Sequence, residues 1–251
     1  MKIMVVDDHV PSLLKISGYI NSLKGYRMLG MVHDGHELIK FCCHQKELPD
    51  IVLLDVQMQK VDGVTAMEFM GSYFPAVKVI AISSHVDERV VSDMLAGGAW
   101  GYVFKDKEMS MLYEALLAVE SNQPYVDRRL FFDISQRGIL IKQRQAEKEW
   151  LFKQYGLSPR EKEILALLVS NMDYREIGEI LNIVPKTIEH TVNNLTKKFD
   201  ITNGRAGLLL HSLRLGLTKM VNLRRGGVKS FSYKWQVGAT KTVQTRFYLL
   251  Y

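Results

Sequence analysis

Short, unbroken runs of apolar residues recur through the first half of the chain, and each ends at a polar side chain. Four of these runs are residues 3–6, 51–54, 79–82 and 102–104. Runs of this length without a polar position indicate strands that are buried on both faces, as in a parallel sheet. A fifth short apolar strand is predicted at 28–32.

Helical patterns separate these strands, as in residues 11–23 and 109–119, where apolar positions recur along one helix face. Five strands, each followed by a helix, predict a doubly wound α/β domain with a five-stranded parallel sheet and right-handed crossovers. Ligands of such sheets bind beyond the carboxyl ends of the strands. We therefore expect one polar site at that edge, built from the residues that follow four of the strands: Asp7, Asp8, Asp55, Ser83 and Lys105.

From Leu157 onward the pattern is helical. Ser158 is placed to cap a helix whose first residue is Pro159, with Glu161 as the capping-box partner. Further helices are predicted at 174–181, at 185–199 and at 205–217. The short turn at 182–184 makes the second and third of these four helices a candidate helix-turn-helix.

The segments between and after these domains are less regular. Residues 125–155 are charged but contain apolar positions, which favours a mostly helical linker that packs on either domain or on a second chain. We divide the chain into residues 1–124, 125–155, 156–222 and 223–251. The last segment has six basic and no acidic residues, and three interpretations stay open: a hairpin, a disordered DNA-binding tail, or a frameshift artefact.

Charge is divided unevenly along the 251 residues. Residues 1–125 contain 11 basic and 16 acidic residues, a net charge of −5, whereas residues 126–251 contain 22 basic and 11 acidic residues, a net charge of +11. An acidic half joined to a basic half suggests a regulatory or cation-binding module tethered to a polyanion-binding module.

Composition limits the cellular compartments in which we expect this protein. The hydrophobic content of 47% supports a globular core, and no run approaches the roughly 20 apolar residues of a membrane span. The chain begins directly with a strand, so we expect no secretory signal. The adjacent Cys42 and Cys43 form no disulfide framework. We expect a cytoplasmic protein with no membrane partner.

The residue types at the predicted sheet edge suit phosphoryl chemistry. Asp7, Asp8 and Asp55 offer the hard oxygen ligands that Mg²⁺ prefers. A carboxylate nucleophile gives an aspartyl-phosphate, and this transfer needs mainly positioning and neutralised charge. Lys105 supplies a point charge for phosphoryl oxygens, and the Ser83 hydroxyl can follow the added phosphate.

Residues 1–122 resemble a response-regulator receiver domain, a flavodoxin-like fold. The resemblance rests on Val5-Val6-Asp7-Asp8-His9, on Asp55 and Ser83, on residues 97–102 (Gly-Gly-Ala-Trp-Gly-Tyr) and on Lys105. It implies that Asp55 is the phosphoacceptor for a sensor histidine kinase, that Asp7, Asp8 and Asp55 bind Mg²⁺ with the backbone carbonyl of Gln57, and that Ser83 and Tyr102 form a switch pair. It also implies a regulator rather than an enzyme, with at most slow Mg²⁺-dependent self-dephosphorylation. Ser84 stands where alanine is frequent.

Residues 157–217 resemble the helix-turn-helix domain of the NarL/LuxR family. The resemblance rests on Leu157–Glu161, Glu176–Leu181, Lys186-Thr187-Ile188 and Asn194–Phe199. It implies a recognition helix that begins at Pro185 and enters the major groove of double-stranded DNA. The expected DNA contacts are Lys186, Thr187, Glu189, His190, Asn193 and Asn194, with Lys197, Lys198 and Arg205 placed for backbone phosphates.

Together these features predict a homodimeric, DNA-binding transcriptional response regulator. The alternative is a phosphorylation-controlled protein–protein regulator whose helix-turn-helix does not read DNA. That alternative arises because Glu189 stands where lysine is usual and Thr191 where histidine is usual. A glutamate that faces phosphates lowers affinity, although one that faces a cytosine amino group reads sequence.

Overall fold

The computed structural model describes residues 1–58, 61–84, 87–106, 109–130, 132–168, 172–201, 204–214, 228–237 and 241–250. The chain forms two compact units, Met1–Met220 and Val221–Tyr251. Each unit is described by itself below.

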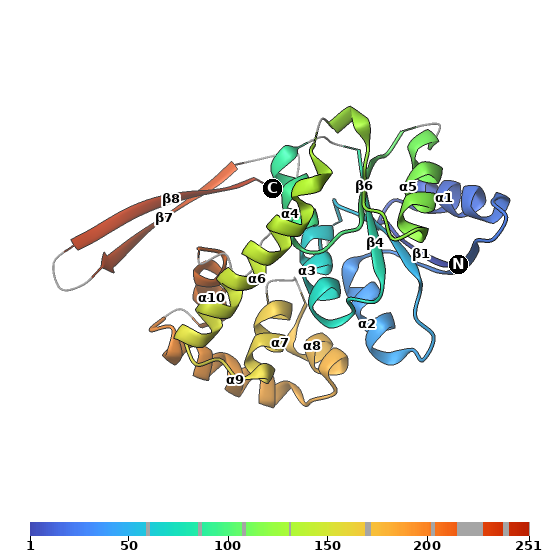
Figure 1. Cartoon of the computed structure of the whole chain (residues 1–251). Helices are drawn as coiled ribbons and strands as arrows, with labels where there is room; N and C mark the ends of the chain where they lie inside the picture. The colour runs from blue at the N-terminus through green and yellow to red at the C-terminus, as the bar shows by residue number, and fades with distance from the viewer. Residues whose placement is uncertain are drawn as a thin grey trace. The chain divides into compact units, whose positions relative to one another are not determined.

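A parallel sheet organises the first part of the larger unit (Figure 1). Its strands are β1 (Lys2–Val6), β2 (Arg27–Val32), β3 (Ile51–Asp55), β4 (Lys78–Ser83), β5 (Gly101–Phe104) and β6 (Tyr125–Val126), in the order β2-β1-β3-β4-β5-β6. The five predicted strands and the doubly wound architecture are confirmed. The short sixth strand was not predicted: Tyr125 and Asp127 donate backbone hydrogen bonds to the carbonyls of Trp100 and Tyr102.

Helices cover both faces of this sheet (Figure 1). They are α1 (Val10–Ser22), α2 (Gly35–His44), α3 (Gly63–Tyr73), α4 (Glu88–Ala96) and α5 (Ser110–Glu120). The apolar faces of α1 and α5 pack against the same side of β1, β3 and β4, around Ile16, Leu53 and Leu116. Local sequence fixes where the helices start, since Asp34 and Asp62 accept hydrogen bonds from the Glu37 and Thr65 backbone amides.

Helical turns and one long helix make up most of the described segment between the two domains. Two short 3-10 turns, Arg128–Leu130 and Ile134–Gln136, lead into α6 (Arg137–Gln154), which packs beside α4. Arg137 donates to the Ala99 and Gly98 carbonyls at 2.6 and 2.8 Å. Arg144 bridges Glu68 at 3.1 Å and Asp93 at 3.0 Å, and Lys148 also pairs with Glu68.

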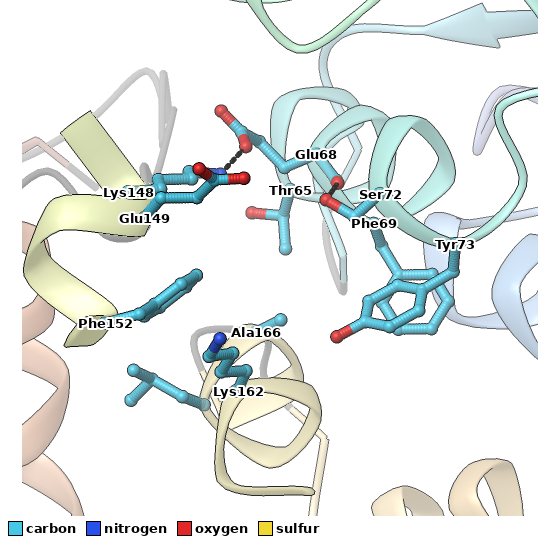
Figure 2. A pocket seen from close by; sticks show the side chains of 11 residues that line it. Thr65, Glu68, Phe69, Ser72, Tyr73, Lys148, Glu149, Phe152, Lys162 and Ala166 are labelled. Carbon is cyan, nitrogen blue, oxygen red and sulfur yellow. Dashed lines mark hydrogen bonds and ion pairs between the residues drawn. The ribbon is translucent and has the colours of Figure 1, made fainter. Parts of the chain in front are cut away.

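A cavity of about 280 Å³ lies near the C-terminal end of α6 (Figure 2). Phe152 points into it from α6, and Phe69 and Tyr73 line it from α3. Lys162 lies over the Phe152 ring at 4.9 Å. The cavity is therefore walled by three separate helices rather than formed within one element.

Four helices form the second domain: α7 (Pro159–Leu168), α8 (Tyr174–Leu181), α9 (Pro185–Lys198) and α10 (Gly204–Arg214). The predicted capping box is present, because Ser158 and Glu161 exchange hydrogen bonds between side chain and backbone. The turn between α8 and α9 places Asn182 in the left-handed region at φ 53°, and Ile183 donates to the Gly178 carbonyl at 2.9 Å. The predicted extension of the last helix to Leu217 lies outside the described residues.

The smaller unit is a two-stranded antiparallel hairpin, β7 (Val228–Val237) and β8 (Lys241–Leu250). Of the three interpretations left open for the tail, the structure has the hairpin. Residues 238–240, which join the two strands, lie outside the described residues. No helix in the described part of the chain is long and apolar enough to span a membrane.

Candidate functional site

Three carboxylates meet at the carboxyl edge of the sheet, as the strand pattern predicts. Asp7, Asp8 and Asp55 each bring an oxygen atom to within 4.8 Å of the others. Asp7 and Asp55 are buried and Asp8 is exposed. A cluster of hard oxygen donors that is open on one side fits a Mg²⁺ ion, which keeps several of its waters when it binds protein.

Parallel strand pairing brings these groups together. Val56 donates to the Ile82 carbonyl at 3.1 Å and Lys105 donates its backbone N–H to the Ser83 carbonyl at 2.7 Å, so the ends of β3, β4 and β5 are tied side by side. The start of α3 lies against the end of β3. A Cβ atom at Gly63 would lie 2.3 Å from the Asp55 carbonyl oxygen, so only glycine permits this approach.

Lys105 brings a positive charge into the site. Its ammonium lies 2.6 Å from Asp7 Oδ2 and 3.2 Å from Asp55 Oδ2. Burial raises the pKa of Asp55 from its ordinary 3.8 to about 6, and Asp7 adds to the rise. Lys105 and a hydrogen bond from the Gln57 backbone oppose it. Among the described residues, three carboxylates and one ammonium meet here, so an excess of negative charge remains and favours binding of a further cation.

This pKa predicts how the stability of the metal-free protein depends on pH. The folded-state pKa lies above the unfolded value, so the folded protein binds an extra proton between about pH 6 and 4. The contribution of Asp55 to the free energy of unfolding should rise as pH falls through this window, by at most about 3 kcal/mol. Urea unfolding in EDTA across the window, with Asp55→Asn as the reference, measures it. A difference between the two proteins that is constant with pH would contradict the assignment.

Ser83 and Tyr102 lie on neighbouring strands, where Ala81 pairs with Tyr102 and Ser83 with Phe104. Both side chains are buried. Burial raises the pKa of the Tyr102 phenol, and the Ser83 side chain nearby opposes part of that rise. The structure thus has Tyr102 in the inward position, and the switch role of this pair stays a prediction.

A second polar cluster beside Lys105 was not predicted. Asp127 is fully buried and accepts hydrogen bonds from the Phe104 backbone at 3.2 Å and from Arg129 Nε at 2.9 Å. Arg129 also bridges to Asp106 at 2.8 Å. The linker is therefore fixed to the segment that carries Lys105. In the sequence the only sign of this cluster is the Arg128-Arg129 pair. Asp106, one of the two partners of Arg129, lies more than 20 residues away along the chain.

Helix α9 presents most of the predicted DNA contacts on its outer face. Its inner face buries Ile188, Val192 and Leu195. The exposed residues include Lys186, Thr187, Glu189, His190, Asn193 and Lys197. Asn194 is half-buried, and its amide lies 3.3 Å from His190 Nδ1.

Two of the predicted phosphate contacts make contacts inside the domain. Lys198 donates to Glu161 at 2.8 Å and to the Gly156 carbonyl at 2.9 Å. Arg205 donates to the Met172 carbonyl at 2.6 Å and lies over the Tyr174 ring. Both side chains therefore brace the fold around α9, and their contact with phosphates stays a prediction.

Comparison with known proteins finds one family match in each of the two main parts of the chain. The family model of the response regulator receiver domain matches residues 3–117, and that of the bacterial regulatory proteins of the luxR family matches residues 156–208. The chain is similar to the transcriptional regulatory protein DegU of Brevibacillus brevis, with 28% identity over 229 residues that cover 88% of this chain and 96% of that protein. It is also similar to the transcriptional regulatory protein LiaR of Bacillus subtilis, with 23% identity over 203 residues (81% and 92%). Among solved structures, the RcsB response regulator of Salmonella typhimurium has 24% identity, coverage of 84% and 97%, and a TM-score of 0.48.

Proposed function

This chain belongs to the response regulators that join a receiver domain to a LuxR-type helix-turn-helix domain, and we propose that phosphorylation of Asp55 controls its binding to DNA. The observation that carries the proposal is the pairing of one Lys105 ammonium with both Asp7 and Asp55 at the sheet edge. The same chain presents the polar face of α9 to solvent. Input and output therefore lie on one polypeptide.

In the proposed phosphorylation, a carboxylate oxygen of Asp55 attacks the phosphorus of a phosphohistidine on a sensor histidine kinase. The phosphorus–nitrogen bond of the donor breaks as the new phosphorus–oxygen bond forms. Lys105 is within reach of the phosphoryl oxygens and offsets their charge. Asp7, Asp8, Asp55 and the Gln57 carbonyl would hold Mg²⁺, which supplies charge neutralisation when bound.

The signal passes from the acyl phosphate to the two strands beside it. The Ser83 hydroxyl lies at the end of β4 and can donate to a phosphoryl oxygen on Asp55, which draws it away from Tyr102. The buried phenol of Tyr102 sits on β5, the strand that β6 ties to the linker. Phosphorylation thereby shifts the population of receiver states and changes how the linker holds the second domain.

The output is the reading of double-stranded DNA by α9, with the whole protein acting as a homodimer in the cytoplasm. Exposed side chains of the first two turns of α9 contact base edges, and Lys186 and Lys197 contact phosphates. DegU and LiaR are named as transcriptional regulatory proteins, which supports this output. Self-dephosphorylation, as part of this proposal, is at most slow and depends on Mg²⁺.

The competing function is a protein–protein regulator that does not bind DNA, motivated by Glu189 on the exposed face of α9. The two functions differ in how binding depends on salt. We expect the intact chain to retain duplex DNA with an affinity that falls steeply as salt rises, and phosphodonor to strengthen the binding.

Glu189→Lys sharpens this test. The substitution replaces an exposed negative charge with a positive one, so affinity for non-specific duplex should rise. The slope of log affinity against log salt concentration should steepen by the amount expected for about one further phosphate contact. Glu88→Lys, an exposed charge reversal on the receiver domain, is the matched control and should change neither. Absence of DNA binding by both the wild type and Glu189→Lys at low salt would favour the protein–protein regulator.

A further inference from the structure

The two faces of the linker helix α6 differ: one contacts the receiver domain and the other is exposed. One face carries Arg137, Arg144 and Lys148 against the receiver domain, where Arg137 also lies over the Trp100 ring at 4.7 Å. Figure 2 shows Lys148 reaching across to Glu68 from this face. These contacts fix the rotation of the helix about its own axis.

The opposite face of α6 is an exposed stripe at heptad spacing. The stripe consists of Ile139, Gln143, Ala146 and Trp150, all of them exposed. The Ile139 and Trp150 side chains keep 58% and 65% of their surface in solvent. At 3.6 residues per turn the stripe lies roughly 200° around the helix from Arg137 and Arg144. The receiver domain therefore leaves this face uncovered.

We propose that α6 pairs through this stripe with α6 of a second copy of the chain, as a short parallel coiled coil. The steps of four, three and four residues place Ile139 and Ala146 at d positions and Gln143 and Trp150 at a positions. Apolar residues at these positions form the seam of a coiled coil. A single polar a residue such as Gln143 fixes the register.

Charge beside the stripe identifies the partner as the same helix. With this register Lys142 occupies a g position and Glu147 the following e position. In a parallel pair the g residue of one helix faces the e residue five positions later on the other. Lys142 then meets Glu147 of the second copy twice, once on each side of the seam. Among the described residues neither side chain takes part in an ion pair within the chain.

The parallel direction follows from the output domain. α6 ends at Gln154 and α7 begins at Pro159, so parallel helices deliver both DNA-binding domains at the same end of the pair. This inference rests on the homodimer of the proposed function and names its interface. Two heptads bind weakly alone, and the pairing becomes effective when DNA or phosphorylated receiver domains raise the local concentration of the two copies.

A charge exchange tests the pairing on the intact, phosphodonor-treated protein by sedimentation equilibrium. Lys142→Glu places like charges across the seam and should weaken the dimer at least about tenfold, as should loss of the Trp150 side chain in Trp150→Ala. The double variant Lys142→Glu/Glu147→Lys restores opposite charges and should restore dimerisation. Met31→Ala, an exposed apolar residue on β2, is the control and should leave the dimer unchanged.

The direction is tested by oxidation of Ile139→Cys in a Cys43→Ser background. Parallel helices place the two introduced thiols opposite each other and give a cross-linked dimer, whereas antiparallel helices separate them. Gln145→Cys, on the opposite face, should not cross-link. A dimer that persists in Lys142→Glu and Trp150→Ala overturns this interface and leaves the proposed homodimer intact. A chain that stays monomeric with phosphodonor and DNA overturns both.

Discussion

Asp55→Asn should abolish acyl-phosphate formation, so that the protein incubated with a small phosphodonor and Mg²⁺ gains no phosphoryl group. An amide offers no nucleophilic oxygen anion, and Lys105 is left to pair with Asp7 at 2.6 Å. The phosphodonor-dependent increase in DNA affinity should disappear with it. Intact-protein mass spectrometry reads the first effect, and DNA titration with and without phosphodonor reads the second.

Asp50→Asn provides the matched control for this loss. Asp50 precedes the other end of β3, where its side chain accepts a hydrogen bond from the Lys2 backbone at 2.7 Å. An asparagine there still accepts that bond, so the variant should be phosphorylated like the wild type. Phosphorylation of Asp55→Asn at the wild-type rate would mean that another residue is the acceptor.

Gly178→Ala should destabilise the DNA-binding domain by about 1–3 kcal/mol, because the new methyl group has no room. A Cβ atom at Gly178 would lie 2.5 Å from the Ile183 carbonyl oxygen, which is backbone and cannot rotate away. The turn that orients α9 must shift to relieve this clash, so DNA affinity should fall as well. Thermal unfolding and DNA titration at fixed salt measure the two effects.

Gly138→Ala makes the same chemical change at a helical position with nothing within 4 Å of the new Cβ. It should leave stability unchanged or raise it by up to about 1 kcal/mol, since alanine favours helix over glycine. Equal unfolding midpoints for Gly178→Ala and the wild type would show that the turn accommodates a side chain, and that its geometry does not depend on glycine.

Local sequence patterns predicted most of the elements for identifiable reasons. The fully apolar runs Ile51–Leu54 and Val79–Ile82 specify central strands because both faces of the sheet are covered. The side-chain caps at Asp34 and Ser158 mark helix starts because they satisfy backbone amides that lack helical partners. The strand β6 was not predicted, because a strand of two residues is too short to show an alternating pattern. It forms by pairing with the open edge of β5.

Some features of the candidate site also follow from the sequence, and others do not. That Asp7, Asp55 and Lys105 share one edge follows from strand order alone, because parallel strands end together. That Lys198 and Arg205 brace the helical domain does not follow from sequence, since their acceptors Gly156 and Met172 lie more than 30 residues away. A basic residue on a DNA-binding helix has the same local sequence whether it faces phosphate or its own domain.

The sequence by itself determined the five main strands, most helices and the helix-turn-helix, because each depends on spacing along one segment of chain, and it determined the acidic edge because parallel strands end together. Only the tertiary structure decided the rotation of α6, which Arg137 and Arg144 fix through contacts with residues remote in sequence. That rotation buries one face of an otherwise charged helix and exposes Ile139 and Trp150 on the other. Ion pairs between residues far apart in sequence do not recur at a fixed spacing, so the sequence pattern does not show which face of α6 they hold against the receiver domain.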